Sequence, residues 1–152
     1  MLVEMRNLTG WRDAQAGKVV ATNGCFDILH VGHLRCLEAA ANLGLCLIVG
    51  INSDAAVRQL KGRNRPINNQ ADRAEMLLGL WCVDAVCIFD DVKATEFLRL
   101  SRPRVYVKGG DYSLAKLDPE ERAALEDVGA KIHFVPTVPN RSTTSILQRL
   151  GG

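Results

Sequence analysis

Short apolar runs alternate with helical patterns along almost the whole chain, and this alternation limits the possible folds more than any other feature. The run at residues 45–51 is the clearest, because it is apolar throughout, as in a strand covered on both faces. Strands that alternate with helices are typical of βαβ units, which build a parallel sheet. Further strands are predicted at residues 18–23, 85–89, 104–107 and 131–135. We therefore predict an α/β fold, a Rossmann-like open sandwich with a five-stranded parallel sheet and helices on both faces.

Signals for the starts and ends of helices lie between these strands. Residues 31–43 carry apolar side chains at helical spacing and end before Gly44, a favourable residue after a helix. Asp118 precedes Pro119, which suits the first helical position. Further helices are predicted after a cap at residues 52–54, at 70–80, at 92–100 and at 142–150. The 152 residues fit one domain, with residues 1–17 as an N-terminal helical prelude packed on the domain of residues 18–152.

Composition excludes several classes of partner. Charged residues make up 24% of the chain and the formal net charge is only +2, so we expect no nucleic-acid partner. The longest apolar run is far shorter than a membrane span, and Glu4 and Arg6 interrupt any signal peptide, so we expect a cytoplasmic protein without a membrane partner. The five cysteines are odd in number and none forms a C-x-x-C pair, so we expect reduced thiols and no protein-held metal.

The unusual clusters of this sequence each follow a predicted strand. They lie at residues 23–33, 52–54, 108–112 and 141–144. Because ligands of open parallel sheets bind beyond the carboxyl ends of the strands, we expect these four segments to meet at one site.

His30-Val-Gly-His33 lies where a helix is predicted to begin. Its histidines are three residues apart and therefore share a helical face, and Gly32 leaves space beside them. A helix start offers free N–H groups to an anion, and imidazoles there can donate to phosphoryl oxygens. Two histidines at a helix end can also be incidental, but their position after Gly24 and Asp27 favours a phosphate site.

Two further segments have both an ordinary and a functional interpretation. The basic loop of Lys61, Arg63 and Arg65 is either a solvated turn or a loop that closes over a polyphosphate. Ser142-Thr143-Thr144 is either a helix cap or a set of phosphate ligands. Other phosphate and nucleophile motifs fail: the spacing from Gly10 to Lys18 does not fit a P-loop, and neither G-x-G-x-x-G nor G-x-S-x-G occurs where it is needed.

Together these segments resemble the cytidylyltransferase-like nucleotidyltransferases over about residues 18–150. Within that superfamily, Val107-Lys-Gly-Gly-Asp-Tyr112 and the S-T-T segment look most like heptose 1-phosphate adenylyltransferases, which make ADP-heptose for lipopolysaccharide cores. In many bacteria that domain is fused to a sugar kinase. This chain has no room for one, so the resemblance implies that a separate sugar kinase supplies the substrate.

The resemblance implies that a sugar phosphate attacks the α-phosphorus of ATP and that pyrophosphate leaves. Catalysis then rests on positioning and charge neutralisation, and Mg²⁺ is expected between the phosphates. His30, His33 and Lys61 would be catalytic, with His33 at the α-phosphate, while Asp27 and Lys108 would bind the acceptor phosphate. The nucleotide would be bound by Thr22, Asn23, Gly24, Cys25, Phe26, Gly32, Asp111, Arg141, Ser142, Thr143 and Thr144.

Alternatives stay open at this point. Related glycerol-phosphate and ethanolamine-phosphate enzymes carry an arginine several residues before S-T-T, whereas Arg141 directly abuts Ser142 here, which argues against those substrates. The same chemistry could use CTP with glycerol 3-phosphate or another polyol phosphate, or ATP with a flavin or pantetheine phosphate. A non-catalytic nucleotide-binding module is a further possibility. Residues 70–80 with Trp81 suit either the core or a homodimer contact.

Overall fold

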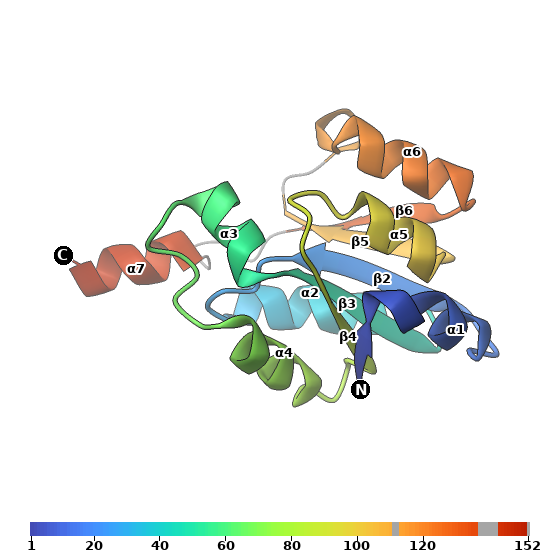
Figure 1. The fold of residues 1–152 in the computed structure, drawn as a ribbon, viewed down its shortest axis with the longest axis horizontal. Helices are drawn as coiled ribbons and strands as arrows, with labels where there is room; N and C mark the ends of the chain where they lie inside the picture. The colour runs from blue at the N-terminus through green and yellow to red at the C-terminus, as the bar shows by residue number, and fades with distance from the viewer. Residues whose placement is uncertain (111–112, 137–142, 152) are drawn as a thin grey trace.

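A computed structural model describes residues 1–110, 113–136 and 143–151. Within that part of the chain, six parallel strands form one sheet in the order β1-β4-β3-β2-β5-β6 (Figure 1). The strands are β1 (Leu2–Glu4), β2 (Val19–Gly24), β3 (Cys46–Asn52), β4 (Ala85–Phe89), β5 (Val105–Gly109) and β6 (Lys131–Val135). The predicted α/β class and parallel sheet are confirmed.

The predicted number of five strands is wrong, because β1 adds a sixth at one edge. This strand comes from the N-terminal segment that we expected to be helical. It pairs in parallel with β4, with Val3 opposite Cys87, and it buries only the side chain of Val3. Three residues with one buried side chain are too few to produce a periodic pattern, so this strand could not be predicted from periodicity.

The helices lie on both faces of the sheet, as predicted (Figure 1). Val20 faces a core under α2 and α4, whereas its neighbour Ala21 faces the core under α1, α5 and α6, because successive residues of a strand point to opposite faces. The helical elements are η1 (Met5–Asn7), α1 (Leu8–Asp13), α2 (Val31–Ala41), α3 (Asp54–Lys61), α4 (Gln70–Leu78), α5 (Thr95–Ser101), η2 (Leu114–Lys116), α6 (Pro119–Asp127) and α7 (Thr143–Gly151).

Side-chain caps fix the starts of the helices near the sheet's carboxyl edge. Ser53 accepts from the N–H of Ala56 at the start of α3, and Asn69 accepts from the N–H of Asp72 at the start of α4. Asp118 accepts from the N–H groups of Glu120 and Glu121 in α6. Each such cap typically stabilises a helix by about 1 kcal/mol. These helices therefore begin at defined positions on the edge where ligands of such sheets bind.

The order of the strands reverses at β2. The chain runs outward from β2 through β3 to β4 and then returns to place β5 on the other side of β2. Crevices form at such switch points, beyond the carboxyl ends of the strands. None of the helices in the described residues is long and apolar enough to cross a membrane.

Candidate functional site

A cavity of about 540 Å³ lies beyond the carboxyl ends of β2, β3 and β5. It is lined by nearly all of the predicted site residues whose side chains the structure describes. These are Thr22, Asn23, Gly24, Cys25, Phe26, Asp27, His30, Gly32, His33, Lys61, Lys108 and Thr143. Asp111, Arg141 and Ser142 lie outside the described residues, as does the side chain of Thr144.

The two histidines lie together at the start of α2. His30 is the N-cap of this helix, and its Nδ1 accepts a hydrogen bond from the backbone N–H of His33 at 3.4 Å. The two rings stack with their centroids 3.8 Å apart, and the ring of Phe26 lies 5.0 Å from that of His33. The sequence spacing thus places both imidazoles on one side of the cavity, beside the free N–H groups of a helix start.

His33 is neutral at physiological pH. Burial, with smaller contributions from the positive charges of His30 and Lys61, lowers its pKa to about 4. Its Nδ1 atom is buried and has no hydrogen-bond partner among the described residues. A protonated ring would carry an unpaired N–H at that atom, which is unfavourable in a buried position. Burial also lowers the pKa of His30.

Lys61 ends α3 and brings a positive charge to the same cavity. Its side chain is exposed, and its charge contributes to the lowered pKa of His33. The histidine pair and Lys61, predicted separately, therefore line one cavity and can act on the same anion. Arg63 and Arg65 do not line the cavity.

Asp27 holds the loop that follows Lys61. The residue is only 2% exposed. Its carboxylate accepts hydrogen bonds from Arg65 Nε at 2.5 Å and from the backbone N–H groups of Ile67 and Asn68 at 2.7 and 3.1 Å. The Asn68 amide donates in turn to the Asp27 carbonyl at 2.7 Å. Burial would raise the pKa of Asp27, but these hydrogen bonds outweigh it and lower the pKa. The carboxylate is thus engaged within the protein, a role that the sequence did not indicate.

Arg73 joins three segments of the chain, one of which lines the cavity at Cys25. It is 1% exposed, and its guanidinium donates to the Cys25 carbonyl at 2.6 Å, to the Asn68 carbonyl at 3.0 Å and to Asp54 Oδ1 at 2.8 Å. Sequence reasoning missed this residue. The available signal was an arginine next to Ala74 on the buried face of α4, where an unpaired charge is strongly disfavoured.

The cavity is also lined by two opposite charges, the partly buried Lys108 and the buried Glu121. Lys108 lies near the end of β5. Burial lowers the pKa of its ammonium group, and attraction to the Glu121 carboxylate partly opposes that decrease. Glu121 is 7% exposed, and one of its oxygens accepts from the N–H of Ala94 at 2.8 Å. Sequence reasoning found Lys108 but missed Glu121. Asn52, Gly109 and Gly110 also line the cavity and belong to the segments predicted to meet there, whereas the lining residues Cys36, Leu60, Val92 and Pro136 lie outside those segments.

The start of α7 reaches the histidine segment. The hydroxyl of Thr143 donates to the backbone carbonyl of Ile28 at 3.3 Å. This contact places the described part of the predicted Ser-Thr-Thr segment beside the loop that leads into α2.

The cavity offers charge and hydrogen bonds rather than a nucleophile. Burial raises the pKa of both Cys25 and Cys36, so these thiols stay protonated at neutral pH. Among the described residues, no group of three or more His, Cys, Asp or Glu side chains is placed to hold a metal ion. The arrangement suits the binding and orientation of anionic reactants that supply their own nucleophile.

Comparison with known proteins agrees with this geometry. The cytidylyltransferase-like family model matches residues 21–149. The bifunctional protein HldE of Streptomyces coelicolor is 48% identical over 136 residues, and that of Geobacter sulfurreducens is 44% identical over 137 residues. Each alignment covers 90% of this chain, but only 29% and 28% of the respective relatives. The chain therefore spans less than a third of the length of these curated relatives.

Solved structures support the same fold. The crystal structure of a lipopolysaccharide core biosynthesis protein from Thermoplasma volcanium has a TM-score of 0.65 and 24% identity, covering 81% of this chain and 98% of the other. Pantoate-beta-alanine ligase from Francisella tularensis has a TM-score of 0.64 and 14% identity, covering 98% of this chain and 72% of the other.

Proposed function

Because the chain belongs to the cytidylyltransferase-like family, we propose that it transfers the adenylyl group of ATP to heptose 1-phosphate. An oxygen of the sugar phosphate forms a bond to the α-phosphorus, and the bond from that phosphorus to the bridging β-phosphate oxygen breaks. The products are ADP-heptose and pyrophosphate. The names of the relatives and of the lipopolysaccharide neighbour support this choice of acceptor.

One observation carries the proposal: the histidine pair, Lys61 and the start of α7 meet in a single cavity at the switch point of the sheet. The start of α2 supplies backbone N–H groups for phosphate oxygens. The neutral imidazoles of His30 and His33 donate hydrogen bonds, with His33 at the α-phosphate. Preorganised donors of this kind stabilise the charge that develops in the transition state.

The remaining residues position the two reactants. The Lys61 charge sits over the triphosphate, and the backbone of residues 22–26 lines the nucleotide site. Thr143, with Arg141, Ser142 and Thr144, would bind the departing phosphates, and Asp111 would bind a ribose or sugar hydroxyl. Lys108 would bind the acceptor phosphate. Asp27 is closer to a positioning role than to the contact with acceptor that the resemblance implied, because its oxygens already accept hydrogen bonds from residues 65–68.

Mg²⁺ is proposed to enter with ATP. The described residues supply no cluster of carboxylates for a protein-held ion, and Mg²⁺ in nucleotide sites takes many of its ligands from phosphates and water. When bound, the ion would neutralise phosphate charge. The side chains and backbone groups of the cavity would bind and orient the reactants.

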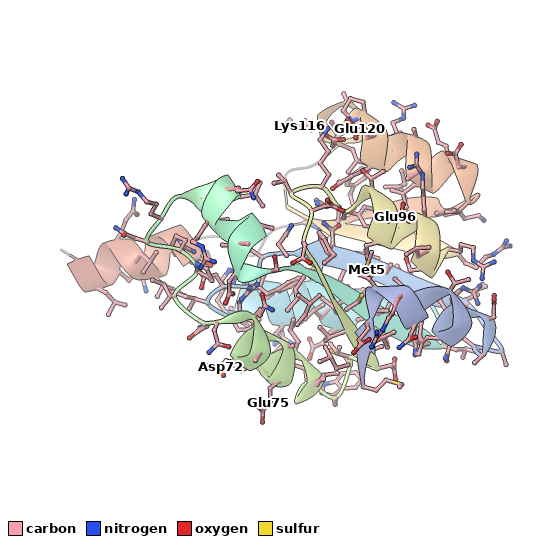
Figure 2. The ribbon with its side chains drawn as sticks, in the orientation of Figure 1. Met5, Asp72, Glu75, Glu96, Lys116 and Glu120 are labelled. Atoms are coloured by element: carbon pink, nitrogen blue, oxygen red, sulfur yellow. The ribbon has the colours of Figure 1, made fainter. Side chains whose placement is uncertain are left out.

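The proposed reaction requires one partner, and an exposed apolar surface suggests a second. A sugar kinase must supply the sugar 1-phosphate. A second copy of the chain would form a homodimer through the outer face of α4 and the turn that follows it, where Met76 and Trp81 are 48% and 76% exposed. Figure 2 shows that Asp72 and Glu75 also extend from α4 away from the sheet. Sedimentation of the wild type and of Trp81→Ser tests the dimer, which predicts a concentration-dependent dimer that the substitution weakens. A wild-type monomer at all concentrations would contradict it.

A pyrophosphate-release screen tests the reaction. Four nucleoside triphosphates are each paired with heptose 1-phosphate, glycerol 3-phosphate and other sugar and polyol phosphates. The proposal predicts release with ATP and heptose 1-phosphate. Release only with CTP and glycerol 3-phosphate would contradict the assigned substrates, and release with no pair would contradict nucleotidyl transfer itself.

A further inference from the structure

We propose that Glu121 binds a hydroxyl group of the sugar phosphate acceptor and so selects polyhydroxylated acceptors over simpler phosphates. This inference rests on the proposed function, because it takes the acceptor to be a sugar phosphate. It goes further by assigning specificity to a residue on α6, far in sequence from the histidines and from the start of α7.

The geometry of Glu121 leaves part of its carboxylate for a ligand. The side chain lines the cavity although the residue is 7% exposed. Oε1 accepts from the N–H of Ala94 at 2.8 Å, and Oε2 accepts no hydrogen bond from the described residues. An ionised carboxylate has about four acceptor positions. A buried carboxylate that uses only one oxygen toward the described residues therefore has acceptor capacity to offer a hydroxyl in the cavity.

The neighbouring acidic residues behave differently. Asp118 and Glu120 bind Lys93 on the outer surface, with distances of 3.2 and 2.7 Å to its ammonium nitrogen. Figure 2 shows Glu120 at the outer side of the start of α6. Three acids at one helix start are expected from the helix dipole alone, but that effect does not require one of them to be buried against a cavity.

The opposite charge beside Glu121 matches the proposed acceptor. Lys108 lines the same cavity, and the carboxylate of Glu121 lies close enough to raise the pKa of the Lys108 ammonium against the effect of burial. An ammonium group binds a phosphate, whereas a carboxylate accepts hydrogen bonds from hydroxyls. The pair therefore presents complementary groups to a molecule that carries both.

A structural role is the competing explanation, since α5 has no side-chain cap of its own and Glu121 accepts from Ala94 at its start. Glu121→Gln separates the two roles, because the glutamine oxygen can still accept from Ala94 while the negative charge is lost. Glu120→Gln is the matched control, one residue away on the outer surface. Glu121→Asp is a second variant, which keeps the negative charge on a side chain that is one methylene group shorter.

The experiment measures pyrophosphate release with ATP, heptose 1-phosphate and a set of its monodeoxy analogues. We expect Glu121→Gln to raise KM for heptose 1-phosphate by about tenfold, as for loss of a charge-assisted hydrogen bond. KM for ATP and Tm stay unchanged, and Glu120→Gln matches the wild type. Glu121→Asp also raises KM for the acceptor. For one monodeoxy analogue, the wild type and both Glu121 variants should have the same KM, because the hydroxyl that Glu121 binds is missing from that analogue.

Any of three kinetic results for Glu121→Gln would overturn the inference: an unchanged KM for heptose 1-phosphate, an equal rise in KM for heptose 1-phosphate and for ATP, or no monodeoxy analogue for which its KM equals that of the wild type. Loss of Tm in Glu121→Gln with normal acceptor kinetics in Glu121→Asp would equally reject it in favour of the structural role. Failure of the proposed function is a separate result, in which the wild type itself releases no pyrophosphate with any sugar phosphate.

Discussion

The hydroxyl of Thr143 donates a hydrogen bond to the backbone carbonyl of Ile28, at 3.3 Å and across 115 residues of sequence. Ile28 lies in the loop between β2 and α2, and Thr143 begins α7. The contact therefore joins the segment that leads to the histidine pair with the segment expected to bind the departing phosphates. One anionic ligand can contact both segments at once, which is what the proposed reaction requires.

Replacement of His33 should impair turnover far more than folding. His33→Ala removes a neutral donor placed at the α-phosphate, and loss of one such preorganised donor lowers kcat by about 10²-fold or more. Steady-state pyrophosphate release measures the change, and thermal unfolding checks the fold. His133→Ala is the control, because His133 is exposed on β6. Turnover at the wild-type rate in His33→Ala would remove His33 from the mechanism.

The lowered pKa of His33 predicts a specific dependence of stability on pH. The folded protein holds this pKa at about 4, against 6.5 for the free side chain, so the unfolded state binds more protons between these values. Stability linked to His33 is therefore fully present above pH 6.5 and is lost as the pH falls from 6.5 to about 4. Denaturant unfolding across this range should show a smaller loss of stability in His33→Ala than in the wild type. Parallel curves for the two proteins would show that His33 is not held neutral.

Lys61 should act on the nucleotide and not on the acceptor. Lys61→Ala removes the positive charge that ends α3 in the cavity, so we expect a higher KM for ATP and a lower kcat, with KM for the acceptor unchanged. Arg63→Ala removes an equally exposed charge two residues away that does not line the cavity. An increase confined to KM for the acceptor would contradict the prediction that Lys61 binds ATP.

Asp27 and Arg65 should be energetically coupled. Asp27→Asn weakens the hydrogen bonds that hold residues 65–68, and we expect a loss of about 2 kcal/mol in the free energy of unfolding. Arg65→Met should cost less in the Asp27→Asn background than in the wild type, as a double-mutant cycle measured in urea would show. Additive effects of the two substitutions would mean that the pair does not fix the loop.

Arg73 should be essential to the shape of the cavity wall. Arg73→Met leaves the Cys25 and Asn68 carbonyls and the Asp54 carboxylate without their shared donor. Loss of a buried charged donor of this kind typically costs about 3 kcal/mol or more. Urea unfolding measures this cost. Arg58→Met, on the exposed side of α3, is the control, and equal stabilities of the two variants would contradict the role of Arg73.

The sheet and the histidine site could be predicted because their signals are local. Short apolar runs mark β2 to β6, and the spacing of His30 and His33 at a predicted helix start places both imidazoles together at the start of α2. The roles of Asp27 and Glu121 could not be predicted in this way. Asp27 is satisfied by residues about 40 positions later in the chain, and the acidic first turn of α6 already explains Glu121 as an ordinary helix start. Only the packing of distant segments shows which oxygens are engaged and which face the cavity.

Following the α-phosphate itself tests the central claim most directly. ATP labelled with ³²P at the α-position is incubated with the wild type, Mg²⁺ and heptose 1-phosphate, and the products are separated. The label is predicted to appear in ADP-heptose, in step with the release of unlabelled pyrophosphate and only when the acceptor is present. Label that stays in ATP, or that appears in free ADP without a labelled nucleotide sugar, would contradict nucleotidyl transfer by this cavity.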